Sequence, residues 1–246
     1  MKSQFVSGLR STAITVDGRY DDWQGNLEPF GSLPVSVQFL NDGEFLYMRL
    51  TATDTSARMQ IMRQGLTVWF DPGGGTKKKI GVRYPVVERG DGEEGRSGGR
   101  RRGGDRPGGE SPDESAASDR VDLLGPGKND ARSLTRDHLP GVDVALHMEQ
   151  GAIQYELKVP LAKTADRTFA LDVQPGKTIG IGLETPKPQQ RALGQGGGGY
   201  GGGGMGGRGG MGGRRGGGRR GGGEERGVQA PKPLNGWATV ATAPAR

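Results

Sequence analysis

The chain has 246 residues, of which 49 are glycine and none is cysteine, and its formal net charge is +6. Without cysteine, disulfide bonds, thiolate metal sites and cysteine nucleophiles are excluded. No apolar run reaches the roughly 18 residues of a membrane-spanning helix, and residues 1–10 lack the apolar centre of a signal peptide. We therefore expect no membrane span and no signal peptide within the chain as written, although a leader trimmed from it would leave the same sequence.

Two glycine-rich or charged tracts differ from the rest of the chain. Residues 88–120 mix both charges almost without apolar side chains, and residues 194–227 are mostly glycine with six arginines and two glutamates. Neither tract can bury enough apolar surface to offset the roughly 1–2 kcal/mol per residue that ordering a backbone costs. We therefore predict two disordered insertions, at 88–120 and 194–227, within a single domain that spans residues 10–242.

The N-terminal part of the chain predicts a strand followed by a hairpin. Residues 14–16 alternate apolar and polar side chains up to the turn formed by Asp17-Gly18, and Trp23 is expected at the edge of the core. Apolar residues alternate again over 35–39 and 46–52, on either side of an Asn-Asp-Gly turn. Alternation on both sides of such a turn predicts a β-hairpin.

The remainder predicts one helix and several short strands. Residues 55–64 have helical spacing and end at Gly65. Strands are expected at 66–71, 79–85, 121–124, 142–146, 153–159, 179–183 and 237–240. In one of them, Gly180 and Gly182 leave one face without side chains. Many short strands with scarcely any helix predict an all-β antiparallel sandwich of the jelly-roll type.

The order of these segments resembles the family 9 carbohydrate-binding modules and the wider group of DOMON-like β-sandwich domains. The matching segments are Ile14–Trp23, Phe45–Asp54, Val68–Asp71, Tyr155–Leu161 and Ile179–Leu183. Residues 61–71 together with 77–85 are also similar to a subgroup of uncharacterised bacterial proteins with this fold. The resemblance implies a periplasmic or secreted protein that binds sugar or haem. Because a fold hosts many functions, the site has to be argued from residues.

Sugar binding requires flat aromatic faces together with polar groups for the hydroxyls. Trp69 alternates with Val68 and Phe70, so it faces away from both, and the pattern leaves open which face is the core. Tyr84 on the expected partner strand and Trp237 near the end could join it. The paired tryptophans of the family's sugar clamp have no residue-by-residue match in this chain. We predict Trp69, Tyr84 and Trp237 as ligand-binding candidates, with core packing as the alternative.

Haem binding in DOMON-like domains uses a histidine and a methionine as axial ligands. The chain has two histidines, and His147 on a predicted strand with Met48 as its mate is the candidate pair. A surface histidine on a sandwich is the alternative interpretation.

Calcium requires several oxygen ligands at loop positions. Four aspartates near predicted turns are candidates: Asp17, Asp21, Asp22 and Asp54. Capping of turns by the same carboxylates is the alternative, and no cofactor is required by the sequence.

Motifs for catalysis are missing from the sequence. It contains no H-E-x-x-H, no G-x-S-x-G and no phosphate-binding loop. Glu149 and Glu156 are interpreted as ordinary strand residues. The chain is therefore predicted not to be an enzyme.

The glycine-arginine tract resembles RGG segments, which bind RNA through arginine charge and stacking. The candidate contacts to RNA or another polyanion are Arg208, Arg214, Arg215, Arg219 and Arg220. The leading hypothesis is a non-catalytic extracytoplasmic module that binds carbohydrate or another cell-envelope partner. An RGG-type RNA-associated protein and a haem-binding domain are the alternatives, and the oligomeric state is open.

Overall fold

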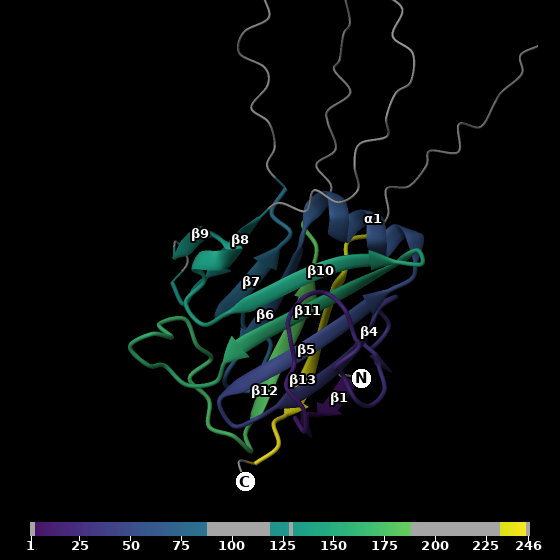
Figure 1. Cartoon of the computed structure of the whole chain (residues 1–246). Helices are drawn as coiled ribbons and strands as arrows, with labels where there is room; N and C mark the ends of the chain where they lie inside the picture. The colour runs from purple at the N-terminus through teal and green to yellow at the C-terminus, as the bar shows by residue number, and fades with distance from the viewer. Residues whose placement is uncertain (1–2, 88–118, 128–129, 188–231, 245–246) are drawn as a thin grey trace, which may run out of the picture. The chain divides into compact units, whose positions relative to one another are not determined.

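The computed structural model describes residues 3–87, 119–127, 130–187 and 232–244. Their strands form two sheets that pack face to face around one core (Figure 1). Of the predicted insertions, 194–227 and all of 88–120 except its last two residues lie outside the described residues. The predicted all-β sandwich is confirmed.

One sheet has seven strands. They are β1 (Ser3–Val6), β6 (Leu66–Asp71), β7 (Ile80–Tyr84), β8 (Arg120–Leu124), β9 (Ala131–Thr135), β12 (Thr178–Glu184) and β13 (Asn235–Ala241). Their order across the sheet is β1-β13-β12-β6-β7-β8-β9. Neighbours run antiparallel, except that β1 pairs with β13 in parallel.

The second sheet has six strands and faces the viewer in Figure 1. They are β2 (Gly8–Leu9), β3 (Glu28–Pro29), β4 (Ser36–Asn41), β5 (Phe45–Ala52), β10 (Asp143–Glu149) and β11 (Ala152–Pro160). Their order is β10-β11-β5-β4-β2, with β3 also paired to β4. The predicted hairpin is β4–β5, in which Phe39 pairs with Met48 and both side chains enter the core.

The predicted helix is confirmed as α1 (Thr55–Gln64), which lies at one end of the sandwich (Figure 1). Asp54 caps its first turn by accepting a hydrogen bond from the Ala57 amide at 2.8 Å. Gly65 ends it at φ 79° and donates to the Ile61 carbonyl. A short 3-10 helix (η1) spans Arg136–His138. Within the described residues, no helix has the length and apolarity that crossing a membrane requires.

Two predictions for the N-terminal region are wrong. The domain begins before residue 10, because β1 belongs to the seven-stranded sheet and β2 to the six-stranded sheet. Residues 14–16 form no strand, since their amides are used elsewhere: the Thr15 amide donates to Asp22 Oδ2 at 2.5 Å and the Asp17 amide to Glu156 Oε2 at 2.9 Å. Residues 10–27, which we call the N-terminal strap, instead cross the outer face of the six-stranded sheet (Figure 1).

The strap is fastened to this face by a buried polar cluster. Glu156 is completely buried and accepts hydrogen bonds from the amides of Asp17 and Gly18 and from the Trp23 indole. The Arg49 guanidinium lies 5.4 Å from the centroid of the Trp23 ring. Burial raises the pKa of Glu156 to about 7. Glu156 is therefore the anchor of the strap and no ordinary strand residue.

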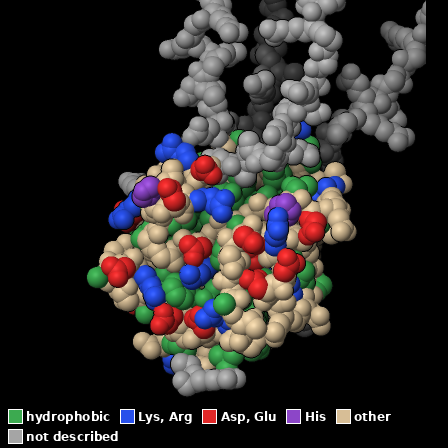
Figure 2. Space-filling view, in the orientation of Figure 1, with side chains coloured by type: hydrophobic (Ala, Val, Ile, Leu, Met, Phe, Trp, Pro, Cys, Tyr) green, Lys and Arg blue, Asp and Glu red, His purple; other side chains and the backbone are tan. Residues whose placement is uncertain are grey.

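Around the strap, this side of the molecule is a mixed surface. Figure 2 shows acidic and basic side chains lying next to one another over it. Trp23 itself is 7% exposed and forms a small second apolar cluster with Leu40 and Tyr47. Its predicted place at the edge of the core is thus refined: Trp23 belongs to the strap and packs against the outer face of the six-stranded sheet.

Candidate functional site

Two of the predicted aromatic candidates share the outer face of the seven-stranded sheet. Val68 and Phe70 point into the core with 0% and 1% exposure, so Trp69 between them points outward. On β13, Ala238 and Val240 are buried in the same way, and Trp237 points outward. Both tryptophans are partly exposed. The face lies on the side of the sandwich turned away from the viewer in Figure 1.

The two tryptophans alternate with glycines in one row across the strands. Trp237 pairs with Gly182, Gly182 with Trp69, and Trp69 with Gly81. A Cβ atom on Gly81 would lie 2.7 Å from Trp69 Cε3, and one on Gly182 would lie 2.7 Å from Trp237 Cε2. Each indole therefore lies over the glycine of the neighbouring strand, close to the backbone, as only glycine permits. We call Trp69 and Trp237 the tryptophan platform.

The expectation that Gly180 and Gly182 leave a bare face is corrected by this packing. Trp237 covers Gly182, and the β6–β7 connection (residues 72–79) covers Gly180, where a Cβ would lie 2.0 Å from the Gly75 carbonyl oxygen. Asp71 holds this connection by accepting hydrogen bonds from the amides of Gly73 and Lys77. Burial by itself would raise the pKa of Asp71, but these amides and nearby Lys79 lower it.

Polar side chains border the platform. The Trp69 indole donates to Glu184 Oε2 at 2.8 Å, which fixes the rotation of the ring. Lys78 Nζ lies 2.5 Å from the same oxygen and 5.6 Å from the centroid of the Trp69 ring. The adjoining cross-strand row continues from Glu184 through Thr67 to Arg83. Charged and hydroxyl groups thus lie beside flat aromatic surface, which is the combination that sugars require.

The register also sets the spacing of the two rings. Trp237 is displaced from β13 over β12, and Trp69 is displaced in the same direction from β6 over β7. The rings are therefore two strand spacings apart, roughly 9.5 Å. A separation of this size spans alternate sugar units of an extended polysaccharide chain, with one unit between the two that face the indoles.

The third predicted aromatic, Tyr84, does not belong to the platform. It is 1% exposed and lies in the core, with its ring centroid 6.4 Å from that of Tyr155. Burial raises its pKa. Tyr84 is in phase with Val82, which points inward, whereas Gly81 and Arg83 point outward. The prediction of Tyr84 as a ligand contact is therefore wrong, because alternation along β7 directs Tyr84 into the core.

The predicted haem ligands lie on opposite faces of the six-stranded sheet. Met48 is 1% exposed and belongs to the core. His147 lies between Leu146 and Met148, both packed against the core, so it points outward. Because the sheet's backbone separates the two side chains, His147 and Met48 cannot bind the same iron atom.

The predicted calcium ligands are placed at turns and at a helix start. Asp17 accepts from the Arg19 amide, Asp22 from the Thr15 amide and Asp54 from the Ala57 amide. Asp21 is exposed in the strap. Among the residues that the structure describes, no group of three or more His, Asp or Glu side chains could hold a metal ion. Capping, the alternative interpretation, accounts for three of the four aspartates.

The predicted polyanion contacts, Arg208, Arg214, Arg215, Arg219 and Arg220, lie outside the described residues. The hypothesis that they bind RNA or another polyanion stays a prediction.

Sequence reasoning missed a cavity of about 310 Å³ at the side of the sandwich. We call it the lateral cavity. Its walls come from β7, β8 and β9 and from residues 163–172, which lie in the connection between β11 and β12 (residues 161–177). Its residues are spread over four separate segments, so no local pattern in the sequence could have revealed it.

No family model matches the chain, and no curated protein matches it. Among solved structures, it is similar to a family 9 carbohydrate-binding module from Caldicellulosiruptor kristjanssonii in complex with glucose, with 11% identity over 75% of this chain and 78% of that chain and a TM-score of 0.34. It is also similar to a putative carbohydrate-binding protein from Bacteroides uniformis, with 10% identity over 75% of this chain and 84% of that chain and a TM-score of 0.37. Both similarities concern the sandwich fold.

Proposed function

We propose that this protein is a non-catalytic carbohydrate-binding domain whose ligand lies on the tryptophan platform. The row Trp237–Gly182–Trp69–Gly81 carries this proposal. It sets two partly exposed indoles over glycines on one sheet face, with Glu184 and Lys78 beside them. Both indoles keep part of their apolar surface in contact with water, and such surface on a sheet face is a feature of binding sites.

Stacking would provide most of the affinity. The C–H surface of a pyranose ring packs against the exposed surface of an indole, whose other face rests on glycine. At Trp69 the sugar packs beside Lys78, whose Nζ lies over the indole, 5.6 Å from the ring centroid. Because Trp69 is held by Glu184 through its ring nitrogen, ordering its side chain costs little on binding. Glu184 accepts from sugar hydroxyls and Lys78 donates to them, so these two side chains orient the ring.

The spacing of the platform favours a linear polysaccharide over a free monosaccharide. With rings roughly 9.5 Å apart, one extended chain contacts both indoles through different sugar units. Binding through two linked contacts gains from effective concentration, so affinity should rise steeply once an oligosaccharide is long enough to reach both rings.

The test is binding to a panel of cellulose, xylan, mannan, chitin and peptidoglycan, and to soluble oligosaccharides of increasing length. Trp69→Ala and Trp237→Ala should each weaken binding about tenfold, a loss of about 1.4 kcal/mol, and the double variant should not bind. Thr239→Ala, on the same strand and face as Trp237, is the matched control. Failure of the wild type to bind any of the panel, or equal binding by the double variant, would overturn the proposal.

A polysaccharide ligand implies an extracytoplasmic location, in the cell wall or envelope, and we include this location in the proposal. Detection of the native protein in cytoplasmic, periplasmic and secreted fractions of its own cells tests it. A strictly cytoplasmic protein would contradict it.

The glycine-arginine tract supports a second candidate, RNA or polyanion binding, from its sequence alone. The variant with Arg208, Arg214, Arg215, Arg219 and Arg220 changed to Ala should lose RNA binding and its salt dependence. Polysaccharide binding through the platform should be the same in this variant. Absence of RNA binding by the wild type at low salt would remove this candidate.

A further inference from the structure

The lateral cavity is lined by folded segments and includes neither tryptophan of the platform. Its volume of about 310 Å³ is large enough for one small ring-shaped molecule. One wall is held in place by backbone hydrogen bonds, from the Leu171 amide to the Pro160 carbonyl and from the Val173 amide to the Leu161 carbonyl, both 2.9 Å. The wall therefore belongs to the folded sandwich.

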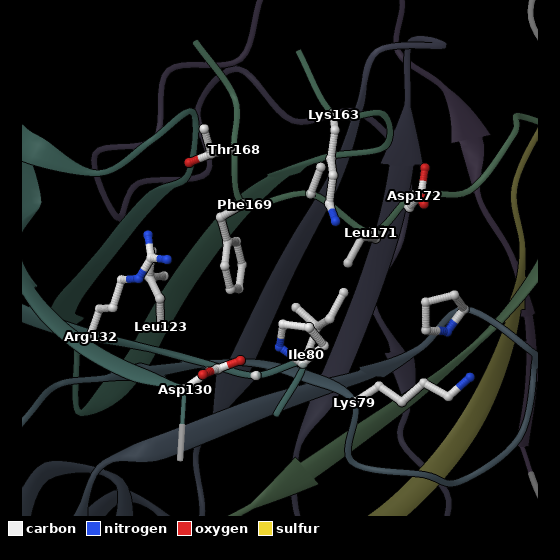
Figure 3. Close-up of a pocket in the computed structure, with 14 residues that line it drawn as sticks. Lys79, Ile80, Leu123, Asp130, Arg132, Lys163, Thr168, Phe169, Leu171 and Asp172 are labelled. Atoms are coloured by element: carbon white, nitrogen blue, oxygen red, sulfur yellow. The ribbon is translucent and has the colours of Figure 1, made fainter. Parts of the chain in front are cut away.

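The inner surface of the cavity is apolar and partly aromatic. Leu123 and Leu171 are 2% and 0% exposed and close its floor together with Ile80. Phe169 is partly exposed, and Figure 3 shows its ring pointing into the cavity. An aromatic ring open to a hollow can pack against the C–H surface of a ligand.

Two cations enter the cavity from different segments. Arg132 comes from β9 and Lys163 from the β11–β12 connection, and both line the space in which the Phe169 ring lies (Figure 3). Among the described residues, neither has an ion-pair or hydrogen-bond partner. Lys79 differs, since it lies 3.5 Å from Asp71 Oδ1. Arg132 and Lys163 are therefore available to a carboxylate of a ligand.

Two carboxylates complete the lining and limit the charge of the ligand. Asp130 accepts from the Gly127 amide with one oxygen, at 3.0 Å, and its other oxygen is available. Asp172 lies at φ 57° on the opposite wall. Two carboxylates in the lining would repel a phosphate or sulfate dianion, and a neutral sugar would leave both cations unpaired. A single carboxylate combined with hydroxyl donors satisfies all four groups.

We propose that the lateral cavity binds one hexuronate unit, the acidic form of a hexose. Its carboxylate lies between Arg132 and Lys163, its C–H surface packs against Phe169, and its hydroxyls donate to Asp130 and Asp172. The cavity is thus a second binding site, specific for acidic sugar, that functions independently of the platform.

The test is titration of the whole chain with D-glucuronate and D-galacturonate, followed by ¹H–¹⁵N chemical shifts. D-glucose, D-galactose and acetate serve as comparison ligands. At least one uronate should shift the amides of residues 168–172 and bind about tenfold more tightly than its neutral hexose or acetate. The Arg132→Gln/Lys163→Gln variant should lose this preference. Lys177→Gln, on the same connection but outside the cavity lining, is the matched control.

The outcomes separate this site from the platform. The Trp69→Ala/Trp237→Ala variant should bind uronate as the wild type does, whatever its polysaccharide binding. Binding of neither uronate, equal binding of uronate and hexose, or shifts confined to residues outside the cavity lining would each overturn the proposal. Because Arg132 and Lys163 are exposed, their variants should fold, and an unchanged melting temperature would confirm this.

Discussion

The outer faces of the two sheets use tryptophan in opposite ways. On the six-stranded sheet, Trp23 is 7% exposed, belongs to the strap and donates to the buried Glu156. On the seven-stranded sheet, Trp69 and Trp237 lie over glycines and remain partly exposed. The difference comes from what covers each face: residues 10–27 cover the first, whereas Trp69 and Trp237 are covered only in part, Trp69 by Lys78. The same residue type is therefore structural on one face and a candidate for binding on the other.

The largest expected effect is the difference in unfolding free energy between tryptophan variants on the two faces. Trp23→Ala removes a buried indole, its hydrogen bond to Glu156 and its contact with Arg49, and should cost about 3–5 kcal/mol of unfolding free energy. Trp69→Ala, at a partly exposed site, should cost about 1 kcal/mol. Urea denaturation of both variants measures the difference. Similar losses for the two variants would show that the faces are not distinct.

Glu156 gives the strapped face a pH dependence. Burial raises its pKa to about 7 from an ordinary value of 4.5. The folded protein therefore retains a proton that the unfolded chain releases, so the contribution of Glu156 to stability is complete below pH 4.5 and is lost as the pH rises through about 7. The expected loss is on the order of 2–3 kcal/mol. Denaturation at several pH values should show this decline in the wild type and not in Glu156→Gln; a wild-type stability that rises over the same window would contradict it.

Substitution of the glycines beneath the platform tests whether the position of the indoles on the sheet matters for binding. Gly81→Val and Gly182→Val place a Cβ within 2.7 Å of an indole, so the ring must move off the sheet. We expect weaker polysaccharide binding and a stability cost of about 1–3 kcal/mol. Gly73→Ala, whose Cβ would lie 3.5 Å from Asp71 Oδ1, is the control. Unchanged binding by both valine variants would mean that the position of the indoles over glycine is not required for polysaccharide binding.

The smallest effect is expected at the edge of the platform. Glu184→Gln keeps an acceptor for the Trp69 indole but removes the ion pair with Lys78, which is partly exposed. Because such pairs contribute little, stability should change by less than about 1 kcal/mol. Binding should weaken severalfold through the lost hydroxyl acceptor. Calorimetry with the same oligosaccharides measures it, and a loss as large as that of Trp69→Ala would assign Glu184 a larger role than orientation.

Local patterns were sufficient for the elements whose partners are close in sequence. The hairpin β4–β5 and helix α1 follow from alternation, an Asn-Asp-Gly turn and the Asp54 and Gly65 caps. The alternation in β6 also predicts that Trp69 faces away from Val68 and Phe70. Tyr84 and Val82 are two residues apart on β7, so the same alternation predicts that both point into the core.

Contacts between distant segments were beyond such patterns. The parallel pairing of β1 with β13 joins Phe5 to Val240. Glu156 anchors a strap that lies more than a hundred residues before it, by bonds to Asp17, Gly18 and Trp23. The lateral cavity likewise assembles from four segments. None of these contacts leaves a periodic signal, because the residues that meet are far apart in the sequence.

The sequence by itself determined the sandwich class, the hairpin, the helix and the alternation within strands such as β6 and β11, because these depend on neighbours within a few residues. Tertiary structure alone decided which face of the sheet Trp69 occupies, that Trp237 lies in its row, and that Met48 and His147 are separated by a sheet. The physical reason is that a strand has two equivalent faces until another layer buries one of them. Packing of the second sheet makes that choice, and the site follows from it.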